Sequence, residues 1–409
     1  MADDGIPGDV AWDNVIGSRW SRWSDGRDPG DPESAHARIA AGIVLPGVSP
    51  TFRLAADDVF FCIGSCFARN IEEHLIYRRL RVISRAVPFG DRVGRVNGIV
   101  NKYAPASILN ELRWSLDGVR FPEDSLIEED GAYRDLHLAA RAPAKPWDEA
   151  LERRTQIRHY FGRLREATVV VITLGLVEAW YDGHAGTMLN AAPSVGMVRR
   201  FPGRFRLVVT DYAQNVRILR EIYDLLIRHL APSVRIVVTV SPVPMSETFT
   251  GRDVVVANTY SKSTLRAAAE DSVREYPNVD YYPSYESIVV SNRALTYHPA
   301  DDLHVLDAAV RLVAEHFLRT YGAGGKVEHP DFVELDYLDA NPDVHQAVID
   351  QTVASGYDHW LAHGRAEGRP LRAAERSLWV DRLVGPRPEG APGPERESLT
   401  PTTPGKASR

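Results

Sequence analysis

The sequence predicts an α/β protein built on a parallel β-sheet with helices on both faces, a three-layer α/β/α arrangement. Short apolar runs typical of buried strands occur at five places, and segments with apolar residues spaced three and four apart, typical of helices, lie between them. Parallel strands need a long crossover connection, usually a helix, so this alternation favours a parallel sheet. The predicted strands are 59–63, 81–83, 168–174, 235–240 and 279–282.

The predicted helices follow the strands directly. The first carries Phe67, Ile71 and Leu75 on one face, and a longer stripe of apolar residues runs from 212 to 230. The last predicted helix spans about 305 to 321, and the Gly-Ala-Gly-Gly that follows it predicts a flexible break. We therefore place the α/β domain at 38–325.

The flanking segments differ from this domain in composition. Residues 1–37 are rich in Gly, Asp and Pro but carry Trp12, Trp20 and Trp23, which predicts an N-terminal arm that docks on another surface. Residues 331–375 are short, polar and helix-like, which predicts a small helical module. In 385–409, six Pro and four Gly make up ten of twenty-five residues, which predicts a disordered tail.

Charge and composition exclude several classes of function. There are 48 basic and 55 acidic residues, a net charge of −7, and no basic block that could follow a phosphate backbone, so we expect no nucleic-acid partner. The acidic start lacks an apolar run, and no later segment is long and apolar enough to span a membrane. Two cysteines, Cys62 and Cys66, are too few for a zinc site or a disulfide framework. We expect a cytoplasmic protein with reduced thiols and no metal or cofactor.

Ser65 is the candidate nucleophile. It lies where the first predicted strand meets the first predicted helix, and in an open parallel sheet such turns lie at the carboxyl edge, where ligands bind. The free N–H groups of a helix N-terminus there could stabilise an oxyanion. The alternative is that Ser65 is merely the N-cap of the helix, a position that serine favours.

A family resemblance supports the nucleophile interpretation. The segment 63–72, Ile-Gly-Ser-Cys-Phe-Ala-Arg-Asn-Ile-Glu, resembles the signature of the GSCFA family, which is related to the SGNH (GDSL-like) esterases and acyltransferases. The resemblance covers about 57–320 and implies that Ser65 is the nucleophile and that its backbone N–H is the first oxyanion donor. Further similar stretches are 101–105 (Asn-Lys-Tyr-Ala-Pro), 172–180 (Ile-Thr-Leu-Gly-Leu-Val-Glu-Ala-Trp) and 240–244 (Val-Ser-Pro-Val-Pro).

The candidate base is His304. A serine attacks a carbonyl well only when a base takes its proton, commonly a histidine held by a carboxylate. Asp301 precedes His304 by three positions, just ahead of the last helix, and the resemblance implies that this Asp-x-x-His element supplies orienter and base. Asp302 competes for the orienting role and His298 is the second candidate base. The alternative is that the aspartates only cap the helix and His304 faces solvent.

The remaining site residues follow largely from the resemblance. SGNH enzymes complete the oxyanion hole with a glycine amide and an asparagine side chain, and Gly175 ends the strand at 168–174. Gly-x-Asn is missing here, so Asn101 is the candidate asparagine, with Asn97 behind it. Cys66 is an alternative nucleophile, and His74 is expected to be a surface or packing residue. We assign substrate binding to Glu178, Trp180, Asn97 and Tyr103.

Together these residues predict a serine-dependent esterase or O-acyltransferase that works through an acyl-serine. The small module resembles a helical repeat appended to bacterial glycosyltransferases, which implies a saccharide-linked substrate, such as an acetyl ester, and a protein partner for the module. The rival interpretation is a non-catalytic glycan-binding or scaffold protein, and the missing Gly-x-Asn favours it.

Overall fold

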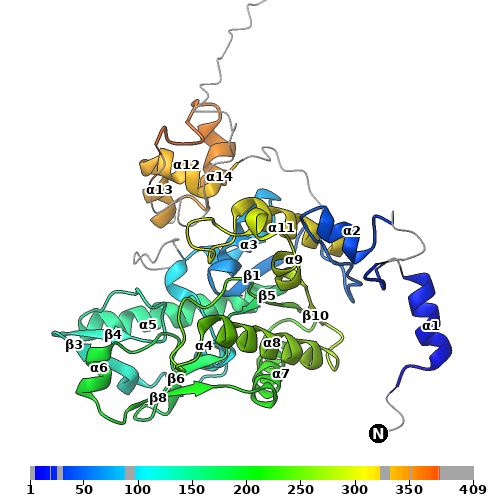
Figure 1. The fold of residues 1–409 in the computed structure, drawn as a ribbon. Coiled ribbons are helices and arrows are strands. Elements are labelled where there is room, and N and C mark those ends of the chain that lie inside the picture. The colour runs from blue at the N-terminus through cyan, green and yellow to red at the C-terminus, as the bar shows by residue number, and fades with distance from the viewer. Residues whose placement is uncertain are drawn as a thin grey trace, which may run out of the picture. The chain divides into compact units, whose positions relative to one another are not determined.

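The computed structural model describes residues 5–18, 20–24, 31–87, 97–322, 332–350, 352–375 and 377. The chain divides between residues 327 and 328 into two compact units (Figure 1). The predicted tail, 385–409, and most of the glycine-rich break lie outside the described residues.

A five-stranded parallel sheet forms the centre of the first unit. Its strand order is β10-β9-β5-β1-β2, and every neighbouring pair is parallel. All five predicted strands are confirmed, with small changes at their ends. They are β1 (Val59–Gly64), β2 (Arg81–Val82), β5 (Val169–Leu174), β9 (Arg235–Val240) and β10 (Val279–Tyr281).

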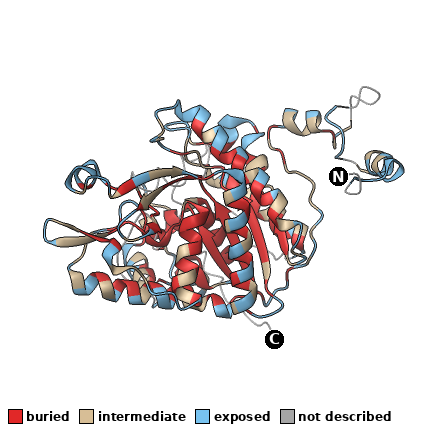
Figure 2. Ribbon diagram, turned by 90° about the horizontal axis from the view of Figure 1, so that it is seen from below, coloured by how far each residue is buried: buried red, intermediate tan, exposed pale blue. Residues whose placement is uncertain are grey.

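The sheet is buried on both faces (Figure 2). Successive side chains of a strand point to opposite faces, and in β1 the rings of Phe60 and Phe61 accordingly enter two different apolar cores. One core contains α3 (Cys66–Tyr77), α9 (Ser284–Val289) and α11 (Asp307–Tyr321). The other contains α4 (Pro105–Leu116), α5 (Trp147–Gly162), α7 (Tyr212–His229) and α8 (Val254–Val273).

Three predicted helices are confirmed. The helix that carries Phe67 is α3, the apolar stripe at 212–230 is α7, and the helix predicted at about 305–321 is α11. Helix α11 begins at Asp307, two residues later than predicted, because Val305 forms an antiparallel bridge with Tyr297 instead. It ends at Gly322, which adopts the left-handed conformation that glycine tolerates best.

The sequence analysis missed the antiparallel strands. These strands are short, carry charged residues and are mostly half-buried, so they lack the continuous apolar pattern of the central sheet. They are the hairpin β3 (Leu126–Glu129) and β4 (Ala132–Asp135), and the three-stranded sheet of β6 (Glu178–Asp182), β7 (Thr187–Met188) and β8 (Phe205–Val209). The remaining elements of this unit are α1 (Gly8–Gly17), α2 (Ala35–Ala40), η1 (Ile83–Arg85), η2 (Gly98–Val100), η3 (Glu123–Ser125), η4 (Arg163–Glu166), α6 (Val195–Arg200) and α10 (Arg293–Thr296).

The N-terminal arm is partly anchored. The indole Nε1 of Trp20 donates a hydrogen bond of 2.9 Å to Glu33, and its ring lies against Gly47. By contrast, α1 buries none of its residues, and Trp12 and Trp23 are exposed. Docking of these two tryptophans stays a prediction.

The second unit has an apolar core of its own. Phe332 packs against the rings of Tyr337, Tyr357 and Trp360, and the buried carboxylate of Glu334 accepts the amides of Gly356 and Tyr357. Its helices are α12 (Glu334–Ala340), α13 (Pro342–Ile349), α14 (Gly356–His359) and a π-helical turn (Trp360–Gly364). None of the helices in the described part of the chain combines the length and apolar character needed to cross a membrane.

Gly64 permits the close approach of β1 to β5 at their carboxyl ends. Its φ is +144°, and a Cβ there would lie 2.0 Å from Thr173 Oγ1 and 2.5 Å from Thr173 O. Both the backbone conformation and the lack of space therefore exclude a larger residue.

We expect Gly64→Ala to lower the free energy of unfolding by about 3 kcal/mol or more, because it combines backbone strain with a clash against a strand. Urea unfolding followed by circular dichroism measures this. Gly162→Ala in α5 is the matched control, since a Cβ there meets nothing closer than 3.8 Å and alanine favours helix. Equal midpoints for the two variants would show that the contact between Gly64 and Thr173 is not a constraint.

Candidate active site

The strand order places a switch point between β1 and β5. From β1 the chain goes to β2 on one side, and from there it returns to β5 on the other. In open parallel sheets, ligands bind at the carboxyl ends of the strands where the direction of the connections reverses. Ser65 directly follows β1 and Gly175 directly follows β5, so both lie at this point.

Ser65 is the N-cap of α3 and is 5% exposed. Its Oγ accepts the amide of Phe67 at 3.3 Å and donates to Ser241 Oγ at 3.2 Å. The backbone N–H of Ser65 donates a long bond of 3.3 Å to Thr173 Oγ1. The N-cap interpretation is therefore confirmed. The nucleophile assignment stays a prediction, because capping uses only a lone pair of the hydroxyl, whose proton is hydrogen bonded to Ser241 in this conformation.

Ser241 is a neighbour that the sequence analysis did not predict. It follows β9 directly, is 1% exposed, and its Oγ accepts a hydrogen bond from the Ser65 hydroxyl. The signal was present, since Ser241-Pro242 belongs to a stretch similar to the GSCFA family and lies after a strand. A serine-proline pair is also common in turns, so spacing alone gave it no role.

Asp301 and His304 form the predicted pair. His304 Nδ1 lies 2.7 Å from Asp301 Oδ2, while the other carboxylate oxygen accepts the amides of Leu303 and His304. A proton on Nδ1 leaves the lone pair on Nε2, the tautomer that a general base requires. Asp302 instead pairs with Arg293 at 2.9 Å, so the structure selects Asp301 as the partner of His304.

Asp301 keeps its negative charge easily. Partial burial acts to raise the pKa of this carboxyl, but the hydrogen bonds from the Leu303 amide and from the ring and amide of His304 outweigh it and lower the pKa. The carboxylate can therefore orient His304 at any pH near neutrality. Both side chains are about one-third exposed, at 36% and 29%.

His298 has the opposite arrangement. Its Nδ1 accepts the amide of Ala300 at 3.1 Å, which places the ring proton on Nε2, and Nε2 is buried with no hydrogen-bond partner among the described residues. A protonated Nε2 cannot accept a proton from a serine. This geometry favours His304 over His298 as the base.

Ser65 and His304 lie at the same edge of the sheet but are not hydrogen bonded to each other. Within the described ranges, Ser65 Oγ pairs with Ser241 and Phe67, and the His304 ring pairs with Asp301. The two segments are linked indirectly, because the hydroxyl of Tyr297 donates to Pro242 O at 2.9 Å, directly after Ser241. Transfer of a proton between Ser65 and His304 therefore requires a local rearrangement or substrate binding.

The segment that carries Asn101 and Tyr103 joins the site. The amide of Lys102 donates to Gly64 O at 2.8 Å, and Tyr103 O accepts the amides of Gly175 and Leu176, each at 3.0 Å. The Gly175 amide is therefore occupied and offers no donor to an oxyanion in this conformation, contrary to the predicted role. The structure gives a packing reason for the glycine, because a Cβ would lie 2.4 Å from Tyr103 O.

Asn101 is buried and Tyr103 is half-buried, and the charge of Cys66 acts on Tyr103. Asn101 Oδ1 lacks a hydrogen-bond partner among the described residues. Burial, reinforced by the charge of Cys66, raises the pKa of Tyr103 to about 12, although a hydrogen bond with the Asn101 side chain and the charge of Arg141 oppose this. The unpaired atom is an acceptor, whereas an oxyanion needs a donor such as Nδ2, so the oxyanion-hole role of Asn101 stays a prediction.

Asn97 belongs to a buried polar network, and its predicted role in substrate binding stays a prediction. Its Nδ2 donates to Glu72 Oε2 at 2.7 Å and to Ser84 O at 3.0 Å. The same carboxylate holds Arg69 at 2.8 Å, and Arg69 in turn donates to Cys62 O. Asn97 is thus part of a buried network that ties α3 to β1 and η1.

Glu178 and Trp180 contact a loop that precedes α8. Glu178 accepts the hydroxyl of Thr248 at 2.6 Å and the amide of Phe249 at 3.1 Å, and the ring of Trp180 packs edge-on against Phe249 at 5.3 Å. Trp180 also covers the small core of the antiparallel sheet. Their direct role is to support this loop, and substrate binding stays a prediction.

Both cysteines are reduced thiols. Cys62 lies in β1, where burial and the nearby charge of Glu72 raise the pKa of the thiol well above its usual value, so it is unreactive. Cys66 is half-buried at the first position of α3. His74, further along α3, is buried and lies 3.5 Å from Asp307 of α11, which agrees with a packing role.

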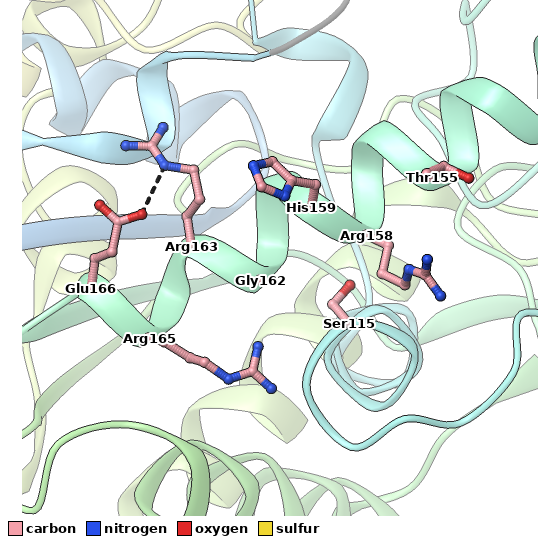
Figure 3. A pocket seen from close by; sticks show the side chains of 8 residues that line it. All are labelled: Ser115, Thr155, Arg158, His159, Gly162, Arg163, Arg165 and Glu166. Carbon is pink, nitrogen blue, oxygen red and sulfur yellow. Dashed lines mark hydrogen bonds and ion pairs between the residues drawn. The ribbon is translucent and has the colours of Figure 1, made fainter.

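A separate surface depression lies at the opposite edge of the sheet. It has a volume of about 590 Å³ and is lined by α5 and η4 with Ser115, as Figure 3 shows. Since η4 leads into the start of β5, the depression lies at the amino edge of the sheet, and none of the candidate site residues lines it.

The sequence was compared with models of known protein families. The GSCFA family model matches residues 59–317, which is more than half of the chain and includes Ser65, Asp301 and His304. The chain belongs to the GSCFA family. No curated protein matches its sequence at a significant level.

The match ends near the close of α11, so the C-terminal unit of this GSCFA protein lies beyond it. Within the matched segment, no cluster of three or more potential metal ligands occurs among the residues that the structure describes.

A buried ionic network holds the Asn101–Tyr103 segment of the GSCFA domain in place. Lys102 Nζ donates to Glu111 Oε2 and to His137 O, both at 2.6 Å, and Arg154 bridges Glu111 to Asp135. Burial, together with the charge of Arg154, lowers the pKa of His137 to about 3, so this imidazole stays neutral in the folded protein. Asp135 has a pKa of about 2, because Arg154 outweighs the opposing effect of burial.

These shifts predict loss of stability in acid. Below pH 6.5, the ordinary pKa of histidine, His137 is protonated in the unfolded chain but remains neutral in the folded chain. The free energy of unfolding therefore falls by up to about 1.4 kcal/mol for each pH unit of acidification. Asp135 adds to this loss below about pH 4. Urea midpoints measured between pH 7.5 and pH 4.5 give the slope.

The variant His137→Gln removes the titration while keeping a donor near Ser125, which lies 3.0 Å from His137 Nε2. We expect it to be less stable at pH 7.5 but to lose less stability per pH unit than the wild type. His159→Gln, at an exposed position of α5, should keep the wild-type slope. A wild-type slope in His137→Gln would rule out this explanation.

Proposed function

We propose that this GSCFA protein is a serine-dependent esterase or O-acyltransferase of the SGNH type, with Ser65 as nucleophile, His304 as base and Asp301 as orienting carboxylate. The observation that carries the proposal is the Asp301–His304 pair, whose tautomer leaves Nε2 free to accept a proton at the edge where Ser65 lies. The sheet order with its switch point beside Ser65 supports the SGNH relation.

The chemistry proceeds in two steps. Ser65 Oγ attacks the ester carbonyl carbon, its proton passes to His304 Nε2, and the carbonyl electron pair moves onto oxygen. The bond to the leaving alcohol then breaks, and the alcohol takes the proton from His304, which leaves an acyl-serine. Water or a second alcohol repeats the sequence on the acyl-serine and restores the free hydroxyl. Hydrolase and transferase use the same residues.

The oxyanion needs donors other than the amide of Gly175. The N–H of Ser65 is bound to Thr173 Oγ1 by a long hydrogen bond that an oxyanion could replace, and the Nδ2 amide of Asn101 would be the second donor. In this proposal Tyr103 lies beside them at the substrate, while Glu178 and Trp180 position the loop at 248–249. The substrate is an acyl, most simply acetyl, ester of a bacterial saccharide, in a cytoplasmic setting, with the C-terminal unit binding a protein partner.

A non-catalytic scaffold or glycan-binding role is the second candidate. It is favoured by the pairing of Ser65 with Ser241 rather than with His304, and by the occupied Gly175 amide. The arrangement of Asp301 and His304 counts against it, because a binding site has no need of an oriented, unprotonated Nε2.

The test is intact-protein mass spectrometry after incubation with an activated acetyl ester. We expect an acetyl adduct or ester turnover in the wild type and neither in Ser65→Ala. His304→Ala should lower kcat/KM by a similar factor, on the order of 10⁴ or more, because nucleophile and base act as a unit.

Two variants complete the design. Asp302→Asn should keep most activity and Asp301→Asn should lose at least tenfold, since only Asp301 contacts His304. Full activity of Ser65→Ala with loss in Cys66→Ala would move the nucleophile to Cys66. Absence of adduct and turnover across several acyl esters would favour the scaffold.

A further inference from the structure

Lys262 of α8 is a buried cation without a carboxylate partner. Its side chain is 2% exposed, and its Nζ donates a hydrogen bond of 2.6 Å to Gly175 O. Among the described residues it forms no ion pair. Burial is the chief cause that lowers the pKa of Lys262 to about 7, and the charge of Cys66 acts in the opposite direction.

Lys102 shows what a structural lysine looks like in this fold. It is equally buried, but its ammonium lies 2.6 Å from Glu111 and 2.6 Å from a carbonyl. A buried ammonium with a carbonyl as its single partner lowers the stability of the fold, because one hydrogen bond to a carbonyl does not compensate for the lost hydration of the charge. Such a group is retained most readily where a negative charge appears during function.

A short chain of contacts connects Lys262 to the Ser65 site. Lys262 Nζ donates to the carbonyl of Gly175, the residue directly after β5. Thr173, two residues before Gly175, accepts the backbone amide of Ser65 with its Oγ1. Cys66, next to Ser65, is close enough to influence Lys262 electrostatically. Ser261, the preceding residue, accepts the amide of Val177 at 3.0 Å, so α8 holds both ends of the 175–177 turn.

We propose that Lys262 is the positively charged residue of the Ser65 site, where its ammonium stabilises the negative charge that develops on the acyl oxygen as Ser65 attacks an ester. The inference rests on the proposed function. Lys262 keeps its proton throughout, since the proton of Ser65 goes to His304, and only the charge on the acyl oxygen changes. A cation here compensates for the occupied Gly175 amide and for the missing Gly-x-Asn.

Other charged groups around α8 do not neutralise Lys262. Arg266, one turn later, pairs with Glu270 and with Glu286 of α9. Towards α7, the charged contact is Arg220 with Asp271, near the far end of the helix. Cys66 is thus the ionisable group that acts on Lys262, with Tyr103 beside Cys66.

The first test is the pH dependence of kcat/KM for acetyl ester turnover. This quantity reports ionisations of the free enzyme, so the wild type should lose activity as pH rises through about 7, when Lys262 loses its proton. Lys262→Arg should move this loss above pH 9, because a guanidinium stays charged. Lys262→Met should lower kcat/KM about 100-fold at pH 6.5 and abolish the alkaline loss.

The second test does not depend on turnover. Alkylation of Cys66 by iodoacetamide, located by mass spectrometry with Cys66→Ala as the blank, reports the thiolate fraction. Lys262→Met should slow this alkylation at pH 7 by about tenfold, because the loss of a nearby cation destabilises the thiolate that reacts. Lys145→Gln, which removes a lysine paired with Glu149 at the start of α5, should change neither measurement.

The outcomes separate the two proposals. A Lys262→Met variant that is destabilised in urea but keeps the wild-type pH profile and Cys66 reactivity would make Lys262 a purely structural residue and overturn the inference. If the wild type turns over no ester, the proposed function fails, and the alkylation rate then decides alone: unchanged reactivity in Lys262→Met refutes the charge effect, and slowed reactivity supports it.

Discussion

The close contact of β1 with β5 at their carboxyl ends is the constraint on which the site depends. Gly64 faces Thr173 with no room for a side chain, so the two strand ends meet and the chain turns sharply into α3. That turn makes Ser65 both the last residue of the strand connection and the first cap of the helix. The carbonyl of Gly64 also receives the amide of Lys102, which draws a third segment to the same point. One glycine thus fixes three pieces of chain.

Buried polar networks fix the positions of these three segments more precisely than apolar packing alone would. The carboxylate of Glu72, in the first turns of α3, accepts hydrogen bonds from Arg69, Ser84 and Asn97. The carboxylate of Glu111 pairs with Lys102 and Arg154 beside the neighbouring segment. Removing one partner of such a cluster leaves an uncompensated charge, so each network acts as a cross-link of defined geometry. The apolar cores provide most of the driving force, while the networks determine where the loops end.

The sequence predicted those features that repeat or alternate. The five strands and the helices α3, α7 and α11 follow from apolar periodicity, and Ser65, Asp301 and His304 follow from motif spacing and a family resemblance. Hydrogen-bond partners could not be predicted in this way. The occupation of the Gly175 amide by Tyr103, the burial of Asn97 against Glu72 and the contact between Ser65 and Ser241 depend on which segments meet in space. The antiparallel strands were missed because their half-exposed faces carry no continuous apolar signal.

The position of α11 has a consequence for synthesis of the chain. Helix α11 packs on α3 and covers Phe67, Ile71 and Leu75, yet it comes from the last part of the domain, more than half the chain after Ser65. While the polypeptide is growing, the apolar face of α3 therefore has no cover from α11, and β1 can pair with β2 but not yet with β5, which is made about a hundred residues later. Such long-range pairing slows folding and leaves apolar surface exposed to intermolecular contacts. Ser65 and His304 come to the same edge of the sheet only when nearly the whole domain has left the ribosome, so a prematurely ended chain would lack the Asp301–His304 pair and be prone to aggregate.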